Sequence, residues 1–233
     1  MIYWYQQIKE VCFIMKPEII YEQVNRWYTA LNGQIDQQIS AEMLQIIELS
    51  KTEMLDNVAK KSGDKYIVSA AKRIIKNAER VVFNKPEFYG MFINQSKDDS
   101  PLYCVCDTYR AVRFNKMMPL QEIDTNNCTP IELSNICLKV DNAVEIKLPN
   151  IVDVKLASKD VVINGKKKVP KPYCIDKEIG LWVNPQYLLD MMECLPNAKV
   201  YAGNSKQLIY FKADNGDGVL CPVNHKKYIM REQ

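Results

Sequence analysis

Cysteine and histidine are the residue types that most often hold metals or act as nucleophiles, and their spacing here argues against both roles. The eight cysteines stand at positions 12, 104, 106, 128, 137, 174, 194 and 221. None has the C-x-x-C spacing of a zinc or thioredoxin-like site, and Cys104 and Cys106 form the only close pair. His225, in a polar segment, is the only histidine. We therefore predict reduced cysteines that fill core positions, no metal and no cofactor.

Three carboxylates are the remaining residues with which an enzyme could work, by holding Mg²⁺: Asp107, Asp214 and Asp217. The last two stand in the run 214–218, where Asp and Gly are expected for a turn alone. The chain has only eight glycines, and it lacks the phosphate-binding glycine motifs and the nucleophile-elbow motif. We predict that the protein is not an enzyme.

Two basic groups are chemically suited to phosphate. An apolar stripe at helical spacing through 67–82 predicts an amphipathic helix whose outer face carries Lys72, Arg73, Lys76 and Arg80. A hairpin is predicted around 161–165, and Lys166, Lys167 and Lys168 crowd its tip. The alternative interpretation of both groups is a solvated surface.

The composition is that of a globular protein. Of the 233 residues, 47% are hydrophobic and 25% are charged, with a formal charge of +3. That charge is too small for nonspecific coating of nucleic acid, so any such contact needs a local patch. No apolar run approaches the roughly 18 residues of a membrane span, and the opening residues lack the pattern of a secretory signal. We expect a cytoplasmic protein without membrane contact.

Charge and periodicity divide the chain near residue 64. Residues 1–64 have six basic and nine acidic residues, against 25 and 19 in 65–233. The first part predicts a helical N-terminal extension, with one helix from about 19 to 31 and a second starting after Ser40.

The second part predicts a helix followed by short strands at 88–94, 102–107 and 109–114, and then the same order again. Asn184 as N-cap and Pro185 start the second helix, and strands follow at 199–202, 208–212 and 218–223. Two such units side by side predict an α+β domain with helices on one face of an antiparallel sheet. Residues 115–180 form an inserted region, read as an insertion with its own role or a mobile arm.

Two segments resemble the sliding clamp family, the beta subunit of bacterial DNA polymerase III. The run 184–192, NPQYLLDMM, with 216–223, GDGVLCPV, is similar to the last helix and closing strands of the clamp's third domain. The run 107–112, DTYRAV, is similar to the threonine-aspartate-glycine-x-arginine strand of its middle domain. The similarity spans roughly 65–225 and suggests a single clamp-like domain of phage or mobile-element type.

The resemblance implies a fold of two repeats, each a helix with antiparallel strands, whose helices face DNA. It implies that the basic helix contacts DNA. It also implies a peptide-binding cleft for replication proteins, composed of Asp107, Thr108, Tyr109, Arg110, Ala111, Val219, Cys221, Pro222 and Val223. Thr108 stands where the family has glycine, and the family's cleft lies between two domains. Taken singly, these residues also fit core strand or salt-bridge positions.

Two functions follow as hypotheses. The first is a non-enzymatic clamp-like protein that binds duplex DNA, a polymerase or other replication proteins, as a processivity or accessory factor. The second is a monomeric interaction module on the clamp fold, such as a phage protein that engages or inhibits a host factor. Whether the chain forms a ring is left open.

Overall fold

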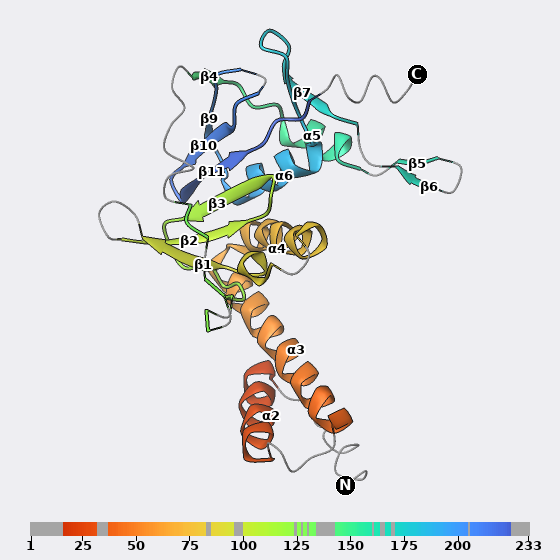
Figure 1. Cartoon of the computed structure of the whole chain (residues 1–233), viewed down its shortest axis with the longest axis vertical. Helices are drawn as coiled ribbons and strands as arrows, with labels where there is room; N and C mark the ends of the chain where they lie inside the picture. The colour runs from red at the N-terminus through yellow and green to blue at the C-terminus, as the bar shows by residue number, and fades with distance from the viewer. Residues whose placement is uncertain are drawn as a thin grey trace. The chain divides into compact units, whose positions relative to one another are not determined.

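The computed structural model describes residues 16–31, 37–82, 85–95, 100–123, 125–126, 128–129, 131–133, 143–159, 161–163, 166–168, 171–204 and 206–224 (Figure 1). The chain divides into two compact units, residues 1–65 and 66–233. Among the helices described, none combines the length and apolarity that crossing a membrane requires.

The first unit is a helical hairpin of α2 (Pro17–Leu31) and α3 (Gln37–Ser62). Ile20 and Val24 of α2 pack against Met43 and Ile47 of α3, with Trp27 and Tyr28 at the margin of this small core. The predicted start of the second helix after Ser40 is wrong: α3 begins at Gln37, and Ser40 lies inside it.

The second unit mixes helices and antiparallel strands, which confirms the predicted α+β class. Its helices are α4 (Lys65–Val81), the 3₁₀ turn η1 (Pro86–Phe88), α5 (Ile151–Ala157) and α6 (Pro185–Cys194). Its strands are β1 (Phe92–Gln95), β2 (Pro101–Cys106), β3 (Arg110–Phe114), β4 (Val144–Ile146), β5 (Val161–Ile163), β6 (Lys166–Lys168), β7 (Tyr173–Asp176), β8 (Leu181–Val183), β9 (Lys199–Ala202), β10 (Ile209–Ala213) and β11 (Gly216–Leu220).

Seven strands form one sheet in the order β1-β2-β3-β11-β10-β9-β4, and every strand pair in it is antiparallel. The strands β3 and β11 lie side by side at its centre, with Ala111 opposite Val219. The pairs β5-β6 and β7-β8 form two separate ribbons. Along the chain, α4 precedes β1, β2 and β3, whereas α6 precedes β9, β10 and β11.

Helix α6 packs on one face of the sheet. A Cβ on Gly218 of β11 would lie 2.8 Å from Cε of Met191 and 2.6 Å from the Ala111 carbonyl oxygen, so helix and strand approach closely. Alternation then places Leu220, Val112 and Phe114 on the same face, and all three are buried. Asn184 caps α6 as predicted, because its side chain accepts hydrogen bonds from the backbone N–H groups of Gln186 and Tyr187.

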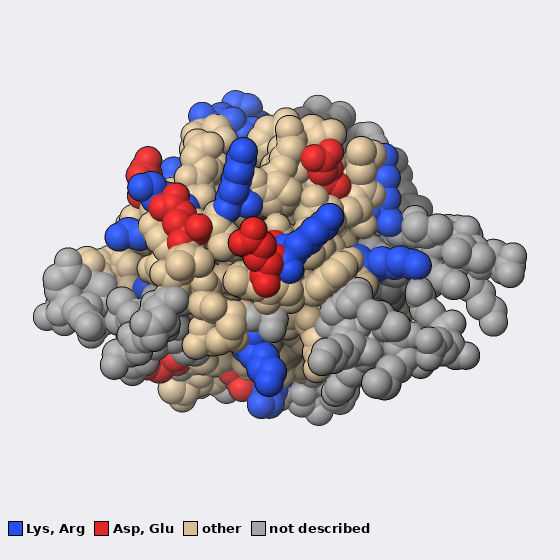
Figure 2. Space-filling view, turned by 90° about the horizontal axis from the view of Figure 1, so that it is seen from above, with Lys and Arg blue, Asp and Glu red and all other residues tan. Residues whose placement is uncertain are grey.

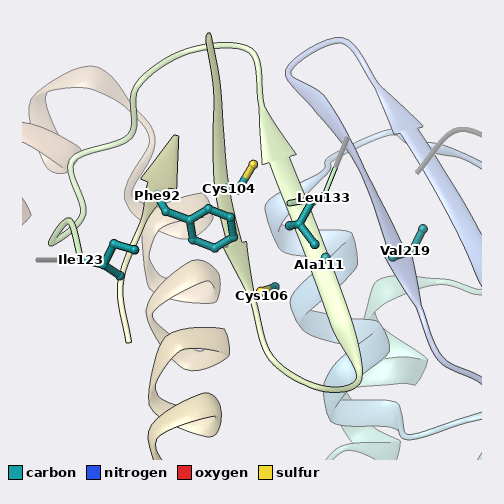
Figure 3. Packing of buried hydrophobic residues seen from close by; sticks show 7 residues of the cluster. All are labelled: Phe92, Cys104, Cys106, Ala111, Ile123, Leu133 and Val219. Carbon is teal, nitrogen blue, oxygen red and sulfur yellow. The ribbon is translucent and has the colours of Figure 1, made fainter. Parts of the chain in front are cut away.

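The opposite face holds a second apolar cluster, which lies in front of the strands while the helices lie behind them (Figure 3). It consists of Phe92, Cys104, Cys106, Ala111, Ile123, Leu133 and Val219. Ile123 and Leu133 belong to the segment after β3, which is tied to β1. The Ile123 N–H donates to the Met91 carbonyl at 2.9 Å, and the Leu133 N–H donates to Oδ1 of Asn94 at 2.9 Å. This part of the inserted region is therefore a cover for the sheet.

Three expected elements differ in the structure. Pro86 begins a 3₁₀ turn, so the first strand begins at Phe92 and not at Phe88. The strand expected from Tyr109 begins at Arg110, because Oδ1 of Asp107 accepts the N–H groups of Tyr109 and Arg110 and holds a turn there. Helix α5 lies inside the inserted region 115–180, where no helix was predicted.

Candidate functional site

The basic residues of α4 differ in how far they are available to a ligand. Lys76 and Arg80 are exposed, Lys72 is half-buried, and the Arg80 guanidinium donates to Oδ1 of Asn77 at 2.8 Å. The helix therefore presents Lys72, Lys76 and Arg80 on its outer side, as the apolar stripe predicts.

The Arg73 side chain forms ion pairs with two acidic residues of α6. Its Nε donates to Oδ1 of Asp190 at 2.6 Å, and its Nη2 binds Glu193. Burial lowers the pKa of Arg73, but the attraction of Asp190 and Glu193 outweighs it, so the pKa is raised overall. Arg73 thus contributes more to joining the two helices than to binding a ligand.

These ion pairs also neutralise the acidic residues of α6. Asp190 is buried between Arg73 and Arg110, and Glu193 lies between Arg73 and Lys155, whose Nζ is 3.3 Å away. Both carboxylates therefore have cationic partners inside the protein. Their negative charge detracts less from the basic face of α4 than the sequence alone would suggest.

Arg110 is the centre of a buried network. Its side chain is 1% exposed, and it binds Asp107 at 3.1 Å and Asp190 on its other side. Asp107 also accepts the Asn77 amide at 2.8 Å. The Arg110 guanidinium lies 4.2 Å from the centre of the Tyr187 ring, a cation–π contact. Asp107 and Arg110 therefore support a surface from beneath and do not themselves form it.

The chain after β11 runs beside the turn before β3. The Cys221 N–H donates to the Tyr109 carbonyl at 2.8 Å, and the Val223 N–H donates to the Trp182 carbonyl at 2.7 Å. The two segments of the predicted cleft are thus neighbours within one unit. Tyr109 is 41% exposed and stacks on Tyr187, with ring centres 5.4 Å apart.

The nine predicted cleft residues fall into three groups. Thr108, Tyr109, Cys221, Pro222 and Val223 are exposed or half-buried along this edge. Asp107 and Arg110 lie beneath it in the buried network. Ala111 and Val219 belong to the apolar cluster on the other face of the sheet (Figure 3), so they cannot line the same surface. We call the surface of Thr108, Tyr109, Tyr187, Cys221, Pro222 and Val223 the tyrosine edge.

Sequence reasoning missed Tyr187 and Asn77. Tyr187 is half-buried, and its pKa is raised by burial, with the Asn77 hydrogen bond opposing that change. A signal was available, because Tyr187 and Asp190 are three residues apart and share one face of α6. Their common partner, Arg110, is 80 residues from Asp190 in sequence, which no local pattern reveals.

Two of the carboxylates considered for Mg²⁺, Asp107 and Asp217, are held by different partners. Asp107 is held by Arg110 and Asn77, whereas Asp217 pairs with Arg113 at 2.7 Å and accepts the Tyr210 hydroxyl at 3.1 Å. No group of three His, Cys, Asp or Glu side chains suited to a metal occurs among the described residues. Cys104 and Cys106 pack in the apolar cluster, the core role expected of them.

Some predicted residues are described only in part. The strands β5 and β6 pair as the predicted hairpin, with Val162 opposite Lys167, but the side chains of Lys166, Lys167 and Lys168 are outside the description. His225 also lies outside the described residues. On the face seen in Figure 2, basic and acidic side chains are interspersed, so that face has no extended field of one sign.

Comparison of the chain with protein-family models, with curated proteins and with solved structures finds no match.

Proposed function

We propose that this chain is a non-enzymatic, clamp-like protein that binds duplex DNA along α4 and segments of replication proteins at the tyrosine edge. The observation that carries the proposal is the arrangement of the sheet. Each half consists of a helix followed by three antiparallel strands, and the order β1-β2-β3-β11-β10-β9 mirrors one half onto the other. Two repeats with helices on one face are what the resemblance to sliding clamps implies.

The DNA arm of the proposal depends on the outer side of α4. Lys72, Lys76 and Arg80 lie there, and the acidic residues of α6 beside them are already paired with arginine and lysine. Phosphate contacts by such residues are electrostatic and independent of sequence. The lysine-rich ribbon β5-β6 would add contacts if it lies against the same duplex.

The protein-binding arm depends on the tyrosine edge. It offers stacked aromatic rings, a proline and neighbouring half-buried side chains at one place, the features by which short peptides are commonly held. Arg110 holds the Tyr187 ring from the protein interior. The edge is composed within one unit, so it does not need a second domain.

Binding of a fluorescent duplex, measured by anisotropy over a range of salt concentrations, tests the DNA arm. If Lys72 and Lys76 each contact a phosphate, K72Q/K76Q lowers the salt slope by about 1.8. Changing Lys166, Lys167 and Lys168 to Ala lowers it by up to about 2.7 if the ribbon also contributes. Lys177, exposed in the β7–β8 turn, supplies the control K177Q, which should leave the slope unchanged. Equal slopes in all the variants would contradict DNA binding by these residues.

The alternative is a monomeric interaction module on the same fold. The ion pairs of Arg73 with Asp190 and Glu193 favour this alternative, because they leave one of the four predicted DNA-binding residues bound inside the protein. Light scattering with and without duplex separates the two functions. An oligomer that binds duplex supports the clamp-like protein. A monomer that does not bind duplex, and whose binding of a partner peptide is lost on Tyr109→Ala, supports the module.

A further inference from the structure

The sheet face away from α6 carries two parallel rows of side chains on its second half. The register places Lys199 of β9, Lys212 of β10 and Asp217 of β11 in one row. The next row contains Glu145 of β4, Tyr201 of β9 and Tyr210 of β10. Both rows face away from α6, because Gly218, which contacts α6, points to the other side of β11.

The first row is more basic than the fold requires. Lys199 and Lys212 stand directly opposite each other, an arrangement that disfavours strand pairing by charge repulsion. Lys147 follows β4 directly and has the same alternation as Glu145, so it extends this row at the sheet's edge. All three lysines are exposed, and none of them has an ion pair within the described part of the chain. Three exposed lysines therefore face outward along this row, and the next row carries one exposed carboxylate, Glu145.

The second row places two aromatic rings beside these lysines. The ring centres of Tyr201 and Tyr210 are 6.4 Å apart. The Tyr210 hydroxyl donates to Asp217 at 3.1 Å, and Asp217 is bound in turn by Arg113. The Tyr210 ring is thereby fixed on the sheet, and Arg113 neutralises the charge of Asp217. Both rings are half-buried, and Tyr210 also packs against the apolar cluster whose members Ile123 and Leu133 cover the other half of this face.

We infer that this surface, formed by Lys147, Lys199, Lys212, Tyr201 and Tyr210, binds single-stranded nucleic acid. Aromatic side chains on an open sheet stack against unpaired bases, and neighbouring lysines contact the phosphates between them. Bases in a duplex are stacked on each other and cannot use the tyrosines in this way. An acidic peptide would use the lysines but would gain little from the rings. The inference is independent of the proposed duplex site, which lies on the outer side of α4.

The experiment uses the whole chain and a fluorescent twenty-nucleotide oligothymidine, with binding followed by anisotropy at several salt concentrations. If both lysines contact phosphate, K199Q/K212Q should lower the salt slope by about 1.4, at 0.7 for each contact. Tyr201→Val should weaken binding roughly 5- to 140-fold through loss of stacking. Tyr201→Phe keeps the ring and should bind within about twofold of the parent. K177Q, which changes a lysine exposed in the β7–β8 turn and outside both proposed sites, should leave oligothymidine binding unchanged.

Several outcomes would overturn the inference. One is that the parent fails to bind oligothymidine at 50 mM salt. Others are an unchanged salt slope in K199Q/K212Q, or equal binding by Tyr201→Val and Tyr201→Phe. Competition by oligoglutamate as effective as that by unlabelled oligothymidine would assign the surface to an acidic protein instead. Circular dichroism melting of each variant shows whether it is folded. If Tyr201→Val does not fold, the salt slope of K199Q/K212Q still decides the inference.

Discussion

Replacing Arg110 by Met should destabilise the second unit more than replacing Arg113 by Met. The Arg110, Asp107 and Asp190 side chains are each at most 1% exposed. Removing one partner of a buried ion pair typically costs about 3–5 kcal/mol, because it leaves a buried charge uncompensated. Asp107 keeps the Asn77 amide, and Asp190 keeps Arg73, so we expect the lower end of this range, about 3 kcal/mol.

The matched control is Arg113→Met. Arg113 also binds an aspartate, but the Asp217 side chain is 19% exposed and can regain water when the arginine is removed. A loss of about 1 kcal/mol, or at most 2, is expected for this variant. The difference between the losses of unfolding free energy in Arg110→Met and Arg113→Met is therefore the quantity that tests the network.

Urea unfolding followed by tryptophan fluorescence measures that difference. The chain has three tryptophans, and Trp182 is the only one in the unit 66–233. In a background with Trp4 and Trp27 changed to Phe, the signal therefore reports that unit alone. With a slope of about 2 kcal/mol/M, the midpoint should fall by about 1.5 M for Arg110→Met. An Arg110→Met protein no less stable than Arg113→Met would refute the argument from burial.

Two further changes test how the sheet is covered. Gly218→Ala should cost about 1–3 kcal/mol in the same assay, since its Cβ would lie 2.6 Å from the Ala111 carbonyl and 2.8 Å from Met191. Gly180→Asn should be nearly neutral, because a Cβ at position 180 would meet no atom within 4 Å and φ there is +64°. A larger loss for Gly180→Asn than for Gly218→Ala would contradict the close approach of α6. Asn94→Leu should cost about 1–3 kcal/mol and speed limited proteolysis within 121–133, because the buried Asn94 amide binds the backbone of Leu133. Proteolysis at the parent rate would show that the cover does not depend on this hydrogen bond.

Much of the fold could be predicted from local patterns. The stripe through 67–82 and the Asn184-Pro185 start of α6 identified α4 and α6, because amphipathic spacing and N-capping are determined by nearby residues. Alternating apolar residues identified the strands at 102–107 and 208–212 to within one residue or two. The short helix α5 was missed, since seven residues carry too little periodicity to distinguish it from a loop or a strand.

The candidate site was less accessible to sequence reasoning. That Arg73 and Arg110 share Asp190 depends on packing between elements more than 70 residues apart, and no local pattern records it. The same holds for Ala111 and Val219, which were grouped with Tyr109 although they pair within the sheet and pack in the apolar cluster, whereas Tyr109 lies in the turn before β3. The lysine and tyrosine rows of β9 and β10 follow from alternation too, but only once the register of the pair is known.

The central pairing of β3 with β11 has a consequence for how the chain assembles. Ala111 meets Val219 only after the whole intervening chain has been made, so the two halves of the sheet join late. Until then β3 presents an unpaired edge, where another chain could pair and begin aggregation. The length of the intervening chain matters little for final stability, because each doubling of a loop costs only about 0.6 kcal/mol. Variation in that stretch should therefore alter the rate of folding and the yield more than the stability of the folded protein.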